Sequence, residues 1–140
     1  MGATAALPVG IYNKLKSVTT AGSVYAYVSG RLYERQAPLD AALPLLVYRV
    51  VTNVPDRYFA NPDIGAEFQI ELYAAFPEVT AGTQIDTVND TLFTLLDGTT
   101  LTISGYTGGA VMCIDRGIVE IESDAIYAIS RWRVWANVSA

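Results

Sequence analysis

The sequence predicts an α+β fold, in which a mainly antiparallel β-sheet carries an N-terminal helix and a central helix packed on one face. Two segments repeat apolar residues at helical spacing, and several others alternate apolar and polar residues as half-buried strands do. The order helix, strand, strand, helix and three strands leaves little room for parallel crossovers. The length of 140 residues, with 51% hydrophobic and 16% charged residues, fits one compact domain over 1–140.

Two helices are expected. The first begins near Pro8, because proline suits a first helical turn, and ends near residues 19–22. Its inner face carries Leu7, Ile11, Leu15 and Val18. The second runs from a capping Thr80 to Asp97, and Gly98 follows as the left-handed residue. Its inner stripe comprises Ile85, Val88, Leu92, Leu95 and Leu96.

The first two strands are predicted at 45–54 and 66–76. The strand at 45–54 is mostly apolar, which indicates burial on both faces. Strict alternation in the strand at 66–76 predicts one core face and one wet face. The core face carries Phe68, Ile70, Leu72 and Phe76, and the wet face carries Glu67, Gln69, Glu71 and Tyr73.

The last third of the chain predicts further strands. A short strand at 101–104, a glycine-rich turn at 105–109 and a strand at 110–116 form a hairpin, and Gly117 interrupts before 118–122. A turn at Ser123 and Asp124 leads into a final strand at 125–136. One face of that strand carries Ile126, Ala128, Trp132 and Val134, and the other carries Tyr127, Ile129, Arg131, Arg133 and Trp135.

The second face of the final strand is the strongest candidate for a contact surface, because arginine and aromatic residues are enriched where proteins meet. The alternative is that loops of the same chain cover this face. We hypothesise that contacts between subunits use the terminal strand together with two aromatic loops. The candidate interface residues are Tyr58, Phe59, Tyr106, Tyr127, Arg131, Arg133 and Trp135.

Several function classes are disfavoured by composition. The chain has no histidine, which removes histidine-activated nucleophiles and histidine-bound zinc. A net charge of −5 argues against a general nucleic-acid-binding surface. The single Cys113 is interpreted as a buried core residue. The N-terminus lacks the basic residues that begin a secretory signal, and no apolar run is long enough to cross a membrane, so neither feature is expected.

No catalytic, cofactor-binding or metal site is predicted. The glycines at 105–109 lack the lysine and the following helix that a phosphate-binding loop needs. One enzyme alternative stays open, in which Glu67, Glu71 or Asp115 performs carboxylate chemistry, with Mg²⁺ as a possible ion. Solvated carboxylates on the polar side of an amphipathic element explain the same residues without chemistry.

The order and spacing of short segments along nearly the whole chain resemble the tail-completion or tail-terminator proteins of long-tailed bacteriophages. The segments are residues 11–16 (IYNKLK), 28–33 (VSGRLY), 37–38 (AP), 42–48 (ALPLLVY), 68–73 (FQIELY), 96–98 (LDG), 124–127 (DAIY) and 131–134 (RWRV). None of these segments is a catalytic motif.

The resemblance implies a structural protein of the virion neck, present in the host cytoplasm during assembly. Its copies would form a ring, a hexamer in this family, that caps the tail tube, ends its polymerisation and joins the head connector. DNA would pass without sequence-specific binding, and an acidic protein gives it little to adhere to. Glu67, Gln69 and Glu71 would line the lumen or face solvent. The alternatives are a head-completion connector of the same neck or a small non-viral binding module.

Overall fold

The structure is a computed structural model that describes residues 3–56, 65–122 and 125–138. Its elements are α1 (Ala3–Leu15), α2 (Val24–Tyr27), β1 (Leu32–Glu34), β2 (Leu45–Asp56), β3 (Gly65–Pro77), α3 (Glu78–Leu96), β4 (Tyr106–Glu122) and β5 (Ala125–Val138). The strands form one five-stranded sheet in the order β1-β2-β3-β5-β4. Only the short β1 pairs in parallel with its neighbour, and the three remaining pairings are antiparallel. The predicted α+β class is confirmed.

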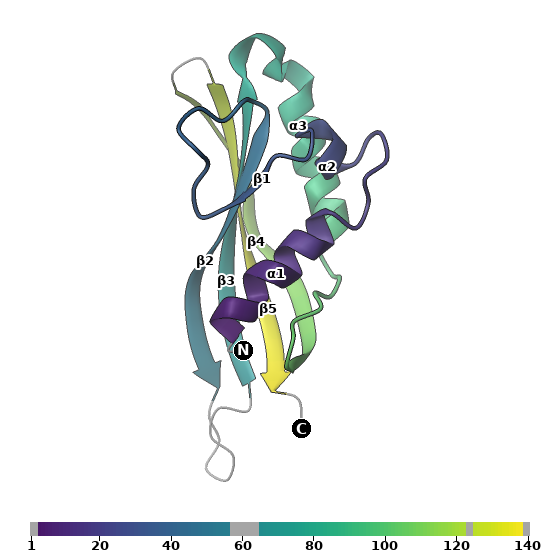
Figure 1. Cartoon of the computed structure of the whole chain (residues 1–140), viewed down its shortest axis with the longest axis vertical. Helices are drawn as coiled ribbons and strands as arrows, with labels where there is room; N and C mark the ends of the chain where they lie inside the picture. The colour runs from purple at the N-terminus through teal and green to yellow at the C-terminus, as the bar shows by residue number, and fades with distance from the viewer. Residues whose placement is uncertain (1–2, 57–64, 123–124, 139–140) are drawn as a thin grey trace.

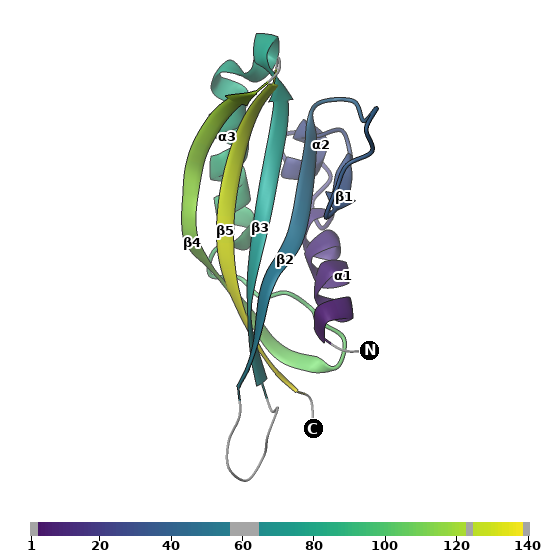
Figure 2. The ribbon, with the colours of Figure 1, turned by 90° about the vertical axis from the view of Figure 1, so that its left-hand side faces the viewer.

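The helices gather on one side of the sheet (Figure 1). α3 packs against β3, β4 and β5, and α1 packs against β2. Figure 2 shows the four long strands face-on, with α3 behind them. Among the described helices, none is both long and apolar enough to cross a membrane. The helices thus cover one face of the sheet, and we call the other face, on which no described helix lies, the open face.

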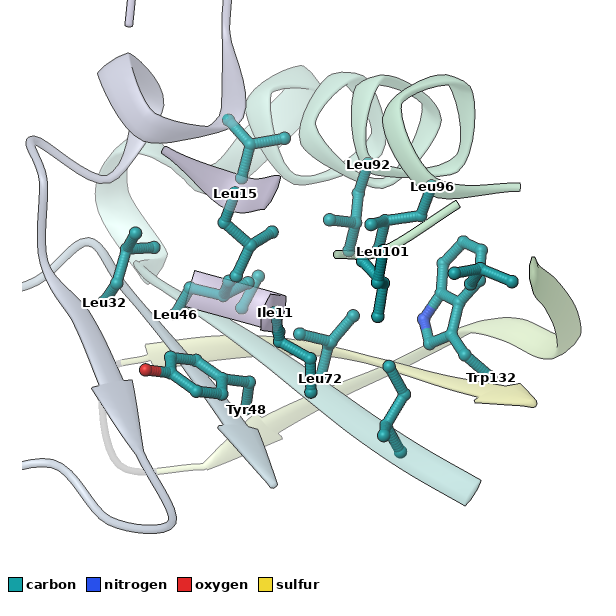
Figure 3. Packing of buried hydrophobic residues seen from close by; sticks show 14 of the residues in the cluster. Ile11, Leu15, Leu32, Leu46, Tyr48, Leu72, Leu92, Leu96, Leu101 and Trp132 are labelled. Atoms are coloured by element: carbon teal, nitrogen blue, oxygen red, sulfur yellow. The ribbon is translucent and has the colours of Figure 1, made fainter. Parts of the chain in front are cut away.

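The core fills the space between the helices and the covered face (Figure 3). Trp132 from β5 is fully buried there, and its indole N–H donates a 2.9 Å hydrogen bond to the Ser130 hydroxyl. Buried side chains of the helices and the sheet belong to the same core cluster, including Leu7, Ile11, Leu15, Leu46, Phe68, Ile70, Leu72, Leu92, Leu96 and Val111. The inner stripes predicted for the two helices thus supply the core, except at Val18.

Both helices begin earlier than predicted. α1 starts at Ala3, so Pro8 lies inside it, because burial of Ala6 and Leu7 outweighs the hydrogen bond that a proline removes. It ends at Leu15, and Val18 lies exposed beyond it. α3 follows β3 directly, with Pro77 at its N-cap, so Thr80 is inside the helix and is not its cap. Gly98 has the predicted positive φ, at 72°.

The expected hairpin between 101–104 and 110–116 is not formed. Residues 106–122 form one long strand, and 101–104 are not a strand. Instead, the connection from α3 touches the edge of β4 through the N–H of Leu101, which donates to Gly109 O at 2.8 Å. Gly117 does not interrupt β4, because bulges on either side of Asp115 absorb the irregularity while pairing with β5 continues.

Two expectations about burial are also wrong. β2 is not buried on both faces along its length, since Arg49 and Val51 are exposed. Cys113 packs against the core cluster as predicted, but it is only half-buried, and its neighbours Met112 and Ile114, expected in the same core stretch, are exposed. In both strands, successive side chains point alternately to the core and to the open face. A continuous run of apolar residues in the sequence does not reveal this alternation.

Candidate functional site

The open face is built by alternation along four strands. Strand side chains point to opposite sides in turn, so every residue that faces the core has neighbours that face away from it. The register brings the outward-facing residues of β2, β3, β5 and β4 into rows across the sheet. The described side chains on this face include Val47, Arg49, Gln69, Glu71, Tyr73, Met112, Asp115, Tyr127, Ile129, Arg131, Arg133 and Trp135.

One row of the open face alternates in charge across all four long strands. Arg49 pairs in register with Glu71, Glu71 with Arg131, and Arg131 with Asp115. Arg49 Nη2 lies 2.6 Å from Glu71 Oε1, and Arg131 Nε lies 3.2 Å from Glu71 Oε2. Arg131 Nη1 lies 3.6 Å from Asp115 Oδ2. Each carboxylate in the row thus lies against at least one guanidinium.

Glu71 is the central member of this row and is only 6% exposed, although no described helix covers it. It was predicted on the wet face, and the difference arises because long neighbouring side chains shield it. Burial raises the pKa of Glu71, but hydrogen bonding with Tyr73, Arg49 and Arg131 outweighs it and leaves the pKa below its ordinary value. Burial and Glu71 together raise the pKa of Tyr73.

Apolar and aromatic groups adjoin the charged row. Met112 is 53% exposed and pairs in register with Arg133, whose guanidinium carbon lies 5.2 Å from the centre of the Trp135 ring. Trp135 is itself partly exposed. Arginine, methionine and tryptophan are residues that interfaces favour. This end of the open face therefore has the composition of a protein contact.

A groove of about 340 Å³ lies at the other end of the open face. Tyr127 and Ile129 of β5 line its floor with Tyr73, and residues 35–37 form its wall. The wall belongs to the 35–44 loop, which joins β1 to β2. The open face thus contains a shallow apolar hollow beside its charged row.

The structure brings most of the predicted interface residues together. Tyr127, Arg131, Arg133 and Trp135 all lie on the open face, in the company of Gln69 and Glu71. Tyr106 does not join them, because it begins β4 and packs half-buried against the core, whereas a flexible turn was expected there. Tyr58 and Phe59 lie outside the described residues. Glu67 pairs in register with Val54 of β2 and with Trp135 of β5.

Three contributors to the open face were missed by sequence reasoning: Arg49, Tyr73 as a partner of Arg49, and Met112. A single charge inside the apolar segment 45–54 was the available signal for Arg49, since an unpaired arginine is rarely buried. Met112 gave no comparable signal, because the bulges that fix the register of β4 are not visible in its sequence.

The carboxylates of the open face are poorly suited to metal or acid–base chemistry. Glu71 and Asp115, two of the three candidates, both face Arg131. Within the described ranges, no group of three potential metal ligands lies together. Burial and the nearby Asp97 raise the pKa of the Cys113 thiol, which disfavours the thiolate form that reacts. The arrangement favours a contact surface over a reaction centre.

Comparison with known proteins finds similarity at the level of the fold. No protein-family model and no curated protein sequence matches the chain. A solved chain from the virion of a native gene transfer agent particle superposes with a TM-score of 0.75 and 14% identity, over 97% of this chain and 98% of that one. A second solved structure, whose name states no function, gives a TM-score of 0.59 at 13% identity, over 97% and 92% of the two chains. At these identities the similarity shows a shared fold.

Proposed function

We propose that this chain is a structural protein of a phage-like virion, a ring-forming tail terminator with six copies in the ring. The observation that carries the proposal is the fold similarity to a virion protein, because the superposition covers 97% of this chain and 98% of that one. The segment pattern that resembles tail terminators supports the finer role. In it, the ring caps the tail tube, ends its polymerisation and joins the head connector.

The open face supplies the contact between subunits in this proposal. Its exposed Met112 and Trp135, next to arginine side chains, would be covered by a neighbouring copy. A contact repeated around an axis closes into a ring when the two surfaces differ. The virion proteins on either side, the tail-tube protein and the head connector, would meet the two rims of that ring.

The charge of the open face also bears on the path of DNA. Glu71 is held by two arginines, so Gln69 and Glu71 do not form the acidic strip that would repel phosphate from a lumen. We therefore assign them to the subunit contact, and leave the lumen to other surfaces of a chain whose net charge is −5.

The test is the mass of the purified protein by light scattering, with negative-stain images of the same sample mixed with tail tubes of the same particle. A ring, or a cap on tube ends, is the expected result. Binding to connector rings while tube ends are ignored would favour the head-completion role. A monomer that binds neither would overturn the proposal.

Two variants test the part that the open face plays. Met112→Glu places a charge in the proposed contact and should abolish the ring. Val9→Glu is the matched control, because Val9 on α1 is also 53% exposed but lies on the covered side of the sheet. The double change of Arg131 and Trp135 to alanine should likewise lose the ring. A ring that survives both open-face changes would contradict the assignment of this face.

A further inference from the structure

We infer that the charged row continues from one copy to the next: the β2 edge of one copy docks on the β4 end of the open face of its neighbour, so that Arg49 pairs with Asp115 of that neighbour. This inference rests on the proposed ring and adds the partner of the open face, which the proposed function leaves open. Four features carry it: the order of charges in the row, the uncovered edges at its two ends, an unsatisfied carboxylate oxygen, and exposed apolar residues beside each end.

The charged row ends in opposite charges at opposite edges of the sheet. Arg49 is its end on β2 and Asp115 is its end on β4, and these are the outer long strands in Figure 2. A neighbour beside the row therefore brings a basic end to an acidic end, and the signs keep alternating across the contact. The order of charges matters here and not the net charge, because the register pairs Glu67 and Glu120 with residues of the same face.

Both edges are uncovered where the row reaches them. β1 pairs with β2 only as far as Tyr48, one residue before Arg49. At the other edge, the connection after α3 contacts β4 as far as Cys113, whose N–H donates to the Asp97 carboxylate. Among the described residues, no backbone hydrogen bond from another segment reaches the outer side of β2 beyond Tyr48 or of β4 beyond Cys113. A neighbouring copy can therefore approach both ends of the row.

Asp115 is the less satisfied end of the row. Its Oδ1 atom is buried without a hydrogen-bond partner in the part of the chain that the structure describes. Arg131 Nη1 approaches Oδ2 only to 3.6 Å, which is longer than a hydrogen bond. The side chain is nevertheless 43% exposed, and with Oδ1 buried a donor from outside the chain would bind Oδ2. A buried acceptor without a donor calls for an explanation, and a missing neighbour supplies one.

Arg49 can supply the donor. Its side chain is 45% exposed. Nε and Nη2 donate to Glu71, and Nη2 also donates to the Tyr73 hydroxyl. A guanidinium has five N–H groups, and the two on Nη1 take no part in these bonds. Arg49 can therefore hold Glu71 within its own chain and bind a second carboxylate of a neighbour.

An exposed apolar residue lies beside each end of the row. Val51 is 49% exposed and Ile114 is 43% exposed, and each is skipped by the register of its strand with the next strand inward. They lie at the same level of the sheet, because they directly follow Val50 and Cys113, the two ends of one row of register partners. Their burial together with Met112 would supply most of the affinity, since a partly exposed ion pair contributes little beyond orientation.

The contact runs head to tail because the inner members of the row need no further partner. Glu71 is 6% exposed and lies against both Arg49 and Arg131. A two-fold contact between two open faces would also set Arg49 against Asp115, but it would require Arg131 of one copy to reach the covered Glu71 of the other. A contact through the ends alone joins two different surfaces on opposite edges, which is the kind of contact that can close into a ring.

Disulfide trapping tests this contact without changing the charged row. In a Cys113→Ser background, Val51→Cys is combined with Ile114→Cys, and the protein is oxidised mildly under conditions in which light scattering shows the ring. We expect a ladder of linked copies that ends at the ring number, because each copy links to one neighbour through each edge. Val9→Cys, similarly exposed but on α1, replaces Val51→Cys as the matched control and should give no ladder.

A double-mutant cycle tests the ion pair itself. Arg49→Gln and Asp115→Asn should each weaken ring assembly roughly two- to fivefold, the range expected for a partly exposed pair. The double variant should assemble no more weakly than Arg49→Gln alone. Two strands separate these residues within one chain, so such coupling points to a contact between copies. Effects that multiply in the double variant would show that the two side chains do not meet.

The outcomes of trapping separate the contact from the ring itself. If the double-cysteine chain yields only linked dimers, the open faces meet across a two-fold axis and the inference is wrong. If light scattering shows a ring but no ladder forms, the inference fails while the proposed function stands. If the unmodified protein forms no ring in any mixture, both fail together.

Discussion

Glu71 shows how a single residue is buried without a covering element. Arg49 and Arg131 lie on the two neighbouring strands, so their guanidinium groups close over the carboxylate from both sides. The free energy of these contacts depends on the ionised form of Glu71. Because the folded pKa of Glu71 lies below its unfolded value, its contribution to stability is complete above the unfolded pKa and is lost as the pH falls through the folded one.

Glu71→Gln should therefore lower the free energy of unfolding at pH 7 by roughly 1–3 kcal/mol, the usual range for a charged hydrogen-bond partner removed from a buried site. The difference between variant and parent should shrink as the pH falls below the ordinary pKa of a glutamate. Urea unfolding at several pH values measures this. Asp86→Asn, at an exposed carboxylate of α3, is the control and should have little effect.

Gly109 is a second residue with a clear structural requirement. Its φ is +75°, and an added Cβ would collide with the Leu101 carbonyl. Gly105 has a similar φ of +83° but open space around it. Gly105→Ala should cost about 1 kcal/mol of backbone strain, and Gly109→Ala roughly 2–4 kcal/mol because steric overlap is added. Equal losses in urea unfolding would mean that the approach of Leu101 is unimportant.

At the scale of elements, the end of α3 is fastened to β4. The Asp97 carboxylate accepts a 2.9 Å hydrogen bond from the N–H of Cys113 next to a bulge, and Gly98 N–H donates to Val111 O at 2.9 Å. Two turns earlier, Arg116 of β4 forms an ion pair of 2.9 Å with Asp90, and its guanidinium group also lies over the Phe93 ring. These contacts fix α3 along the edge strand.

Asp97→Ala should leave the Cys113 N–H without its acceptor and reduce stability by about 1 kcal/mol. Hydrogen exchange at Cys113 should rise more than exchange in β3, since the loss is local. Asp97→Asn keeps an oxygen in the same place and should restore most of the protection. No change in exchange at Cys113 for Asp97→Ala would show that water replaces the carboxylate at no cost.

At the scale of the whole molecule, the proposed ring covers the arginine side chains of the open face with a neighbouring copy. If charged contacts of these arginines hold the copies together, added salt should weaken assembly, because the Debye length falls from about 10 Å at 0.1 M to about 3 Å at 1 M. Light scattering across this range should show smaller species at high salt. A ring that becomes more stable with salt would indicate that apolar burial alone holds it together.

Much of the architecture follows from local sequence. The alternation in 66–76 and 125–136 fixes which side chains face the core, and the structure buries Phe68, Ile70, Trp132 and Val134 as predicted. The stripe from Ile85 to Leu96 likewise identifies α3 and its inner side. These patterns are reliable because the period of a strand or helix determines side-chain direction before any packing occurs.

The tertiary structure decided what periodicity leaves free. Register placed Arg49, Glu71, Arg131 and Asp115 in one row, although they come from four strands distant in sequence. Pairing of β4 with β5 placed the exposed Met112 beside Arg133, and bulges around Asp115 kept the strand continuous past Gly117. The chain by itself therefore determined the α+β class and the arginine-aromatic face of its last strand, whereas strand pairing decided the partners of that face, because cross-strand neighbours depend on contacts between distant segments.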